Sequence, residues 1–265
     1  MSNHQPRKRF GQHFLRDRSV IQRIVHAFAP RAGEPVVEIG PGEGVLTREL
    51  LPYITPLNVV ELDRDLVAHL QATYPREQLI VHQADALNFD FCALAPADRT
   101  LRVIGNLPYN ISTPLLFHLL DQIDCIADML FMLQKEVVDR LAAKPDTADY
   151  GRLSVMVQSR VRVEALFDVS PQAFFPPPKV NSAVVYLTPH STPPIDLRDP
   201  ATFAHVVKTA FAARRKTLRN NLKELIAAER LQALGIDPQR RAETLTLEEF
   251  ARIANALPNA RSGIA

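Results

Sequence analysis

Apolar residues recur along the first half of the chain in short runs that are separated by amphipathic segments. We interpret the runs as buried strands, whereas the apolar residues between them stand three or four positions apart, as in helices. Strands that alternate with helices at these spacings predict an α/β fold built on a mainly parallel, doubly wound sheet. The predicted strands span residues 35–40, 57–62, 79–82, 101–105 and 126–133, and the predicted helices span 19–28, 45–51, 65–73, 113–120 and 134–141.

The second half of the chain has a different pattern. Residues 161–169 and 182–187 are apolar runs typical of strands, and we expect them to be late, antiparallel members of the sheet. Between them, the proline-rich stretch 174–179 predicts a rigid loop. Residues 188–194 contain three prolines and no apolar pattern, so they predict a linker, and residues 200–257 repeat at helical spacing.

The linker separates the two domains that the sequence predicts. We expect residues 1–191 to form the α/β domain, with a basic and aromatic segment at its start, and residues 192–265 to form a small all-helical domain. Residues 1–31 hold seven Lys or Arg and one acidic residue, and residues 195–265 hold twelve Lys or Arg and eight acidic residues. The formal net charge of the whole chain is only +2, so the residues between these segments are acidic on balance. Basic ends around an acidic middle suit a polyanion that is held at both flanks, although charged runs are also usual on solvated surfaces.

Composition argues against a membrane-spanning or secreted protein. No run approaches the ~20 apolar residues that span a bilayer, and the polar, basic N-terminus has no apolar signal-peptide region. The two cysteines, Cys92 and Cys125, show neither CxxC nor Cys/His ligand spacing. We therefore expect reduced thiols, a cytoplasmic location and no metal site.

The predicted strand at 101–105 ends in a stiff turn, Asn106-Leu107-Pro108-Tyr109. Pro108 fixes its own φ and biases Leu107 toward extended backbone, so the turn holds its side chains still. A carboxamide beside an aromatic ring suits chemistry on a flat base with an exocyclic amine, such as adenine. The Asn106 side-chain oxygen and the Leu107 carbonyl would accept the two N–H groups, and Tyr109 would stack on the ring. Alternatively, the turn is only a strand end, with Tyr109 as part of the core.

Glycines and acids follow the first three predicted strands. The segment 40–44, Gly-Pro-Gly-Glu-Gly, lets the backbone approach a ligand closely, but its spacing is not that of pyrophosphate binding. Glu61 ends the second strand, where a carboxylate can accept both ribose hydroxyls, and Asp85 follows the third, where one can accept from an adenine amine. The ends of neighbouring parallel strands meet at one edge of the sheet, so Glu61, Asp85 and Asn106 are expected to lie together. They predict a site for an adenosine without phosphates, and S-adenosylmethionine fits that description. Singly, each residue is also explained as a surface acid, a turn former or a helix entry.

Five blocks of the sequence belong together: Phe10–Leu15, Val37–Gly44, Gly105–Ser112, Phe174–Ser182 and Arg214–Leu222. In combination they resemble the ribosomal RNA adenine dimethyltransferase family, in its bacterial small-subunit branch. Many methyltransferases share the glycine block, but its combination with the other four is specific and extends over most of the chain. The resemblance implies S-adenosylmethionine as methyl donor, no metal, and dimethylation of two adjacent adenosines in the 3′-terminal hairpin loop of 16S rRNA. The partner would be an assembling small subunit, and the protein a cytoplasmic monomer.

The resemblance also implies which residues act. His13 departs from the Asn that is often found at its position in the family. A contact from its main chain to the methyl donor would survive this change, whereas a contact from a carboxamide side chain would be lost. Phe174, rather than Phe175, is the expected second stacking ring. The expected catalytic residues are Asn106, Pro108, Tyr109 and Phe174; the expected cofactor contacts are His13, Leu15, Gly40, Glu61, Asp85 and Asn106; and the expected RNA-binding cations are Arg7, Lys8, Arg9, Arg214, Arg215, Lys216 and Arg219. A solvated helix face is the alternative for the last four cations.

Three other functions remain open from the sequence alone. A resistance-type large-subunit rRNA methyltransferase shares the fold and an Asn-x-Pro-Tyr-like motif, but it fits the block 214–222 less well. A DNA adenine methyltransferase would more usually show Asp/Asn-Pro-Pro-Tyr. The chain could also be a ribosome-assembly factor that acts mainly by binding.

Overall fold

The computed structural model describes residues 13–97 and 100–258, which form two compact units. The first unit comprises the described residues up to Val138 together with 163–189, and the second comprises 139–162 and the described residues from His190 onward. Each unit has its own buried apolar core.

The second unit includes a segment, residues 139–162, that the sequence-based boundary at 191 assigned to the first domain. Tyr150 and Val155 of this segment belong to the same apolar core as Phe203. The apolar pattern of the segment is too short to show which of the two cores it joins, because this depends on tertiary packing against residues distant in sequence.

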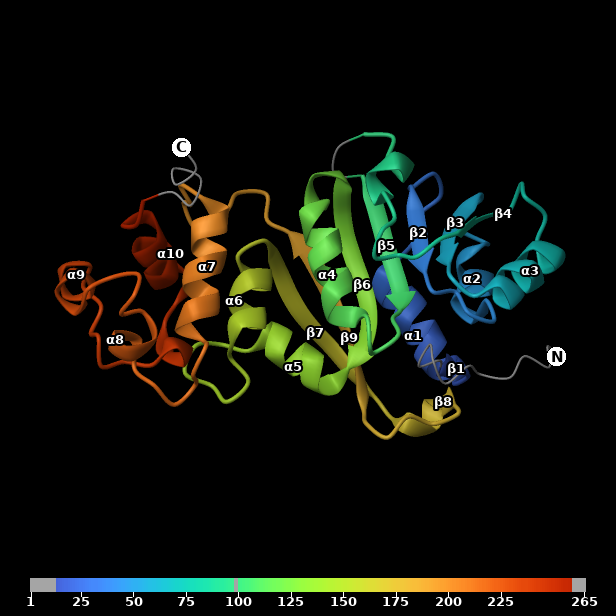
Figure 1. Ribbon diagram of the computed structural model, residues 1–265. Helices are drawn as coiled ribbons and strands as arrows, with labels where there is room; N and C mark the ends of the chain where they lie inside the picture. The colour runs from blue at the N-terminus through green and yellow to red at the C-terminus, as the bar shows by residue number, and fades with distance from the viewer. Residues whose placement is uncertain (1–12, 98–99, 259–265) are drawn as a thin grey trace. The chain divides into compact units, whose positions relative to one another are not determined.

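A seven-stranded sheet carries the first unit, in the order β4-β3-β2-β5-β6-β9-β7 (Figure 1). Strands β4, β3, β2, β5 and β6 are parallel, and β9 is antiparallel to β6, which confirms the predicted doubly wound architecture. The strand order reverses between β2 and β5, where such sheets place their ligands. The sheet strands are β2 (Val36–Ile39), β3 (Leu57–Glu61), β4 (Leu79–Gln83), β5 (Leu101–Asn106), β6 (Ile126–Gln134), β7 (Val161–Val169) and β9 (Ser182–Pro189).

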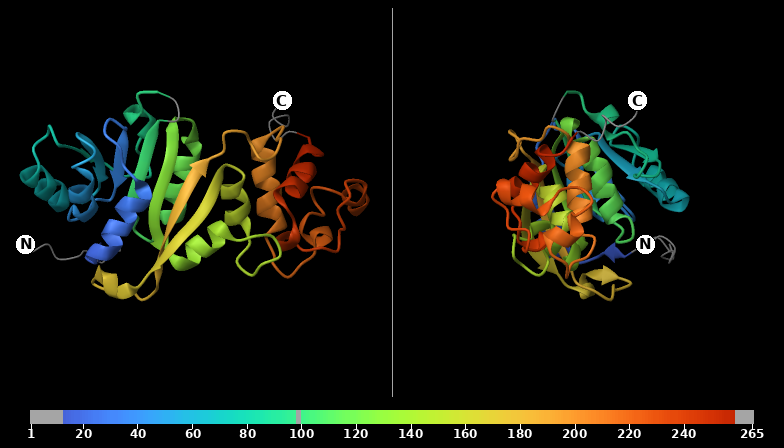
Figure 2. Two further views of the ribbon diagram at one scale, coloured as in Figure 1. Left: turned by 180° about the vertical axis from the view of Figure 1, so that it is seen from behind. Right: turned by 60° about the vertical axis from the view of Figure 1, so that its left-hand side comes forward.

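Helices cover both faces of this sheet, with α1 and α4 on opposite faces in Figures 1 and 2. Helix α1 begins after Asp17, whose side chain accepts hydrogen bonds from the N–H groups of Ser19 and Val20 and so caps the helix. Within the described residues, no helix is long and apolar enough to cross a membrane. The α-helices of the first half are α1 (Arg18–Phe28), α2 (Val45–Leu50), α3 (Arg64–Thr73), α4 (Ser112–Asp121), α5 (Lys135–Ala142) and α6 (Arg152–Gln158).

The second unit packs around α7, whose predicted apolar stripe is buried. Phe203 and Val206 of α7 share a core with Phe250 and Ile253 of α10. The helical pattern predicted over 200–257 is not one continuous helix, because turns separate several short helices within it. The helices are α7 (Pro200–Ala210), α8 (Leu218–Asn221), α9 (Ala228–Ala233) and α10 (Leu247–Asn255), and the short 3-10 turns of the chain are η2 (Phe91–Leu94), η3 (Ile123–Cys125), η4 (Pro171–Ala173) and η5 (Ala242–Thr244).

A two-stranded ribbon joins the start of the described chain to the proline-rich stretch. Strand β8 (Phe174–Phe175) pairs antiparallel with β1 (Phe14–Leu15), with Phe14 opposite Phe175 and Leu15 opposite Phe174. The N–H of Arg16 donates to the carbonyl of Ala173 across 2.8 Å and extends the pairing. The predicted loop at 174–179 therefore begins as a strand.

The two cysteines form a disulfide, so the prediction of reduced thiols is wrong. Cys92 lies in η2, ahead of β5, and Cys125 ends η3, immediately ahead of β6. Because β5 and β6 are parallel neighbours, their preceding turns meet although 33 residues separate the cysteines. The side-chain oxygen of Gln122 accepts from the N–H of Phe91 across 2.7 Å and ties the same two turns together.

Candidate active site

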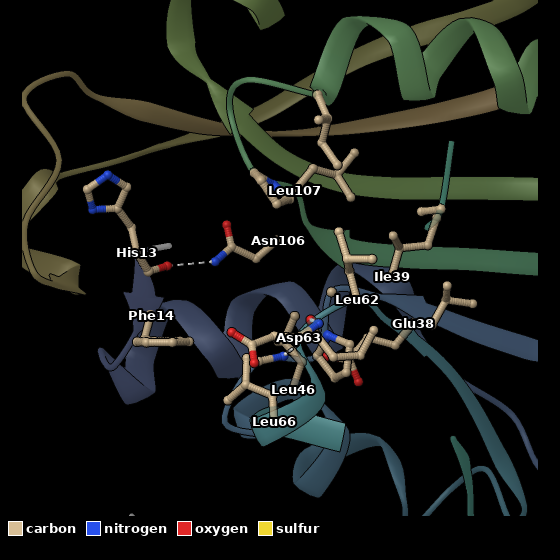
Figure 3. A pocket seen from close by; sticks show the side chains of 18 of the residues that line it. His13, Phe14, Glu38, Ile39, Leu46, Leu62, Asp63, Leu66, Asn106 and Leu107 are labelled. Carbon is tan, nitrogen blue, oxygen red and sulfur yellow. Dashed lines mark hydrogen bonds between the residues drawn. The ribbon is translucent and has the colours of Figure 1, made fainter. Parts of the chain in front are cut away.

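A cavity of about 220 Å³ opens at the carboxyl ends of β2, β3, β4 and β5. Its wall includes the segments that follow these four strands and, from the ribbon, His13 and β1 (Figure 3). The structure thus brings together all the cofactor-contact residues that the sequence predicted, and three of the four catalytic ones. These lining residues are His13, Leu15, Gly40, Glu61, Asp85, Asn106, Pro108 and Tyr109.

The glycine segment after β2 needs its glycines at two positions. Gly42 has a φ of +58°, and a Cβ on it would lie 3.2 Å from the ring of Phe14. Gly44 has a φ of +78°, and a Cβ there would lie 3.2 Å from Leu70. Left-handed backbone and close neighbours together exclude a side chain, so the segment turns tightly along the cavity wall.

Glu61, at the end of β3, is 8% exposed and braces the glycine segment. Its Oε2 accepts from the N–H of Gly42 across 3.3 Å, and its Oε1 accepts from the N–H of Asp63 across 2.9 Å. Burial raises the pKa of Glu61, and these N–H donors oppose that rise. Each carboxylate oxygen has a second lone pair, so Glu61 can still accept from a ligand in the cavity.

Glu38 is a cavity residue that the sequence reasoning missed. Its side chain is 1% exposed, and its Oε2 accepts from the hydroxyl of Thr47 across 2.6 Å. Burial raises the pKa of Glu38 to about 8; the Thr47 hydrogen bond opposes this rise, and the charge of Glu61 adds to it. An acid inside an otherwise apolar predicted strand was the available sign of a special role.

Asp85 follows β4 and is held in a turn. Its Oδ1 accepts from the N–H of Leu87 across 3.0 Å, and its Oδ2 accepts from the side chain of Asn88 across 3.2 Å. The turn-former role that the sequence left open is therefore real, and it presents the carboxylate at the cavity. The adjacent apolar cavity residues Leu62 and Ala86 also escaped the sequence reasoning.

Asn106 ends β5 with its amide fixed in one orientation. Its Nδ2 donates to the main-chain carbonyl of His13 across 3.2 Å (Figure 3). Since a carbonyl only accepts, the amide nitrogen must face it, and Oδ1 is turned elsewhere as an acceptor. The preceding residue, Gly105, has no room for a side chain, because a Cβ there would lie 2.5 Å from the carbonyl oxygen of Ile39 in the adjacent strand.

The Tyr109 ring is fixed from two sides. Its hydroxyl shares a hydrogen bond of 2.7 Å with Ser182 at the start of β9, and burial raises its pKa. The ring of His13 stacks against it with the centroids 5.7 Å apart. His13 Nδ1 donates to the carbonyl of Pro176 across 2.7 Å, so this imidazole is engaged by Tyr109 and the proline-rich stretch.

Phe174, the expected second stacking ring, is not among the residues that line the cavity, and its stacking role stays a prediction. It is 5% exposed and packs in the core of the first unit, whereas Phe175 is 52% exposed. Neighbouring residues of a strand point to opposite sides, and in β8 the side that faces the core carries Phe174. The local sequence Phe-Phe does not show which ring faces inward.

The predicted RNA-binding cations have different surroundings. Arg7, Lys8 and Arg9 lie outside the described residues. In the second unit, Arg214 donates to the carbonyl of Ala148 and pairs with Glu243 at 3.5 Å. The exposed cations Arg215 and Lys216 lie with Arg214 in the turn between α7 and α8, and Arg219 lies on α8, so three of these four cations are not on a helix face.

No group of three or more His, Cys, Asp or Glu side chains suited to a metal ion occurs in the part of the chain that the structure describes. The cavity is lined by carboxylates, glycines, two amides, the rings of His13 and Tyr109, and apolar side chains. Its donor set therefore suits an organic ligand.

The sequence profile of the family described as "Ribosomal RNA adenine dimethylase" matches residues 3–259. The chain belongs to this family. A relative from Thiobacillus denitrificans is 58% identical over 250 residues, 94% of this chain and 97% of its own length. A relative from Laribacter hongkongensis is 56% identical over 255 residues, 96% of this chain and 97% of its own length. Both are named "Ribosomal RNA small subunit methyltransferase A".

Two solved structures are similar over nearly the whole chain. A dimethyladenosine transferase from Plasmodium falciparum has a TM-score of 0.76 and 23% identity, and covers 91% of this chain and 96% of its own. The 23S rRNA methyltransferase ErmE has a TM-score of 0.70 and 27% identity, and the match covers 92% of this chain and 99% of the ErmE chain. The expected family and the Rossmann-like methyltransferase fold are confirmed.

Proposed function

We propose that this protein transfers methyl groups from S-adenosylmethionine to N6 of two adjacent adenosines in the 3′-terminal hairpin loop of 16S rRNA, and dimethylates each. The observation that carries this proposal is the 53–58% identity, over nearly full length, to relatives named for the small ribosomal subunit. The 23S enzyme is similar at only 27% identity, so the large-subunit alternative is not favoured. We further propose that a cytoplasmic monomer acts on an assembling small subunit.

The cavity supports S-adenosylmethionine as the ligand. Among the described residues that line it, none is Lys or Arg, whereas five are acidic: Glu38, Glu43, Glu61, Asp63 and Asp85. This charge suits an adenosine that carries a cationic group in place of phosphates. We propose that Glu61 accepts from the ribose hydroxyls, Asp85 accepts from the adenine amine, and Gly40, Leu15 and the His13 backbone complete the contacts.

S-adenosylmethionine, when bound, supplies a methyl group on a sulfonium. The lone pair of an adenine amine is delocalised into the ring, so its nitrogen becomes a nucleophile only when acceptors hold both N–H groups. Asn106 Oδ1 and the carbonyl of Leu107 are the proposed acceptors, and Pro108 keeps them in place. Catalysis then consists mostly of positioning, which can contribute several kcal/mol.

The target base must leave its stack to reach the cavity, as in other enzymes that modify bases. Tyr109, held by Ser182 and His13, is the proposed ring on which it stacks. No side chain is needed as a general base, because the N6-protonated product is a strong acid that loses its proton to water. Phe174 keeps its predicted stacking role only if the ribbon rearranges, since it lies in the core.

Methyl transfer is tested with tritium-labelled S-adenosylmethionine and small subunits that lack the modification, followed by mapping of the label to a nucleotide. Label on two adjacent adenosines of the 3′-terminal hairpin supports the proposal, and label on the large subunit or none at all contradicts it. An Asn106→Ala variant that still binds the particle but transfers nothing distinguishes an enzyme from a factor that acts by binding.

A further inference from the structure

Phe175 is a half-exposed aromatic ring on the ribbon that borders the cavity. Directly cross-strand residues point to the same side of a ribbon, and Phe175 is opposite Phe14, whose side chain lines the cavity. Phe174 and Leu15 occupy the other side and belong to the core of the first unit, although Leu15 also reaches the cavity. Phe175 therefore lies on the same side of the ribbon as Phe14, with its ring open to solvent.

Arg16 is also on this side of the ribbon, two residues after Phe14. Its guanidinium carbon lies 4.8 Å from the centroid of the Phe175 ring, and its NH2 group lies 3.3 Å from Glu43 of the glycine segment. A cation over an aromatic face is favourable, and it orients the ring. The cavity rim thus presents an aromatic surface and a cation side by side.

The segment after Phe175 holds this ring in place. Three prolines follow it, and the carbonyl of the first, Pro176, accepts from the His13 ring across 2.7 Å. Beyond the prolines, Lys179 and Val180 are exposed. An exposed ring with Arg16 over it and Lys179 four residues later in the chain has the composition of surfaces on which single-stranded bases stack.

We propose that Phe175 and Arg16 form a stacking platform for a nucleobase of the unpaired RNA strand next to the adenine that enters the cavity. The proposal rests on the proposed function, since it assumes that an RNA strand reaches this cavity. A base flipped into a pocket keeps its neighbours outside it, where they need a surface to stack on. An apolar protein segment is the competing occupant, but the flanking cations favour a polyanion.

The chain contains no tryptophan, so a Phe175→Trp variant carries a single fluorescent reporter at the platform. Tyr53→Trp is the matched control: Tyr53 is 51% exposed, close to the 52% of Phe175, but it precedes β3 and so lies at the opposite edge of the sheet from the cavity. Each variant is titrated with a hexaadenylate RNA and, separately, with inorganic polyphosphate, which has the charge but no bases.

We expect hexaadenylate to quench the Phe175→Trp emission in a saturable way, polyphosphate to leave it unchanged, and Tyr53→Trp to respond to neither. In parallel, Phe175→Ala is expected to weaken hexaadenylate binding about five- to twentyfold, as for the loss of one stacked base, with affinity for S-adenosylmethionine unchanged. Unquenched emission, or equal quenching by polyphosphate, overturns the platform.

Tritium transfer to small subunits by the Phe175→Trp variant separates the two ideas. Transfer without quenching means that the proposed function stands and the platform is wrong. Quenching without transfer by the parent protein means that bases stack on Phe175 but that the proposed function fails.

Discussion

The side-chain amide of Asn106 donates to the main-chain carbonyl of His13, 93 residues earlier in the chain, across 3.2 Å. The contact is made by the backbone of residue 13, so it does not depend on whether that residue is His or Asn. The imidazole of His13 is instead directed to Pro176 and Tyr109. The departure from the family's usual Asn is therefore compatible with a fixed Asn106.

Asn106→Ala should abolish methyl transfer without unfolding the protein. The variant removes an acceptor that matters most when charge develops on the adenine nitrogen, and loss of one such group lowers turnover about 10²- to 10³-fold. Single-turnover rates and a melting curve for parent and variant provide the measurement. Asn106→Asp is the control that keeps the Oδ1 acceptor but replaces the nitrogen that donates to His13 with a second oxygen. Equal rates in the parent and Asn106→Ala would contradict the role.

Glu61→Gln should weaken binding of S-adenosylmethionine by about 2 kcal/mol, because hydrogen bonds to a charged acceptor are stronger than those to a neutral one. Calorimetric titration measures this loss. Glu49→Gln, on the solvent side of α2, should bind as the parent does. If Glu61→Gln also binds as tightly as the parent, Glu61 only braces the glycine segment.

Glu38 should make the protein less stable as pH rises from about 5 to 8. Its pKa is raised from 4.5 to about 8, so in this window the folded state keeps a proton that the unfolded state has lost. Unfolding free energy then falls by about 1.4 kcal/mol per pH unit, and the loss ends above the raised pKa. The difference in unfolding free energy between the parent and Glu38→Gln, measured across this range, isolates the effect. A constant difference would mean that Glu38 does not titrate as described.

The triple change Arg215→Ala, Lys216→Ala and Arg219→Ala should weaken binding to the small-subunit particle. The slope of log affinity against log salt concentration should also become shallower by roughly one for each lost phosphate contact. Arg214 is left in place because it contacts Ala148 and Glu243 within its own unit. Binding is measured over a salt series, with affinity for S-adenosylmethionine as the control for folding. Parallel lines for parent and variant would show that these cations do not touch RNA.

Most of the sheet and most of the residues that line the cavity at its strand ends follow from local sequence. Runs such as 57–62 are strands because their apolar residues fill a two-sided core. Glu61 and Asp85 line one cavity because parallel strand ends share one edge. The failures concern contacts between distant segments. Cys92 meets Cys125 because β5 and β6 are parallel neighbours, a pairing that joins turns far apart in sequence. The burial of Phe174 rather than Phe175 likewise depends on the pairing of β1 with β8. Local periodicity contains no information about such pairings.

The discontinuous second unit limits how this protein can be divided into fragments. Tyr150 donates to the carbonyl of Leu245 across 2.9 Å, and Asp146 donates through its N–H to the carbonyl of Glu243. A stop codon placed after residue 191 would leave Tyr150 and Val155 without the core that buries them. Such a fragment should expose apolar surface and aggregate, so an apparent loss of methylation in it would report misfolding and say nothing about RNA binding by the C-terminal helices.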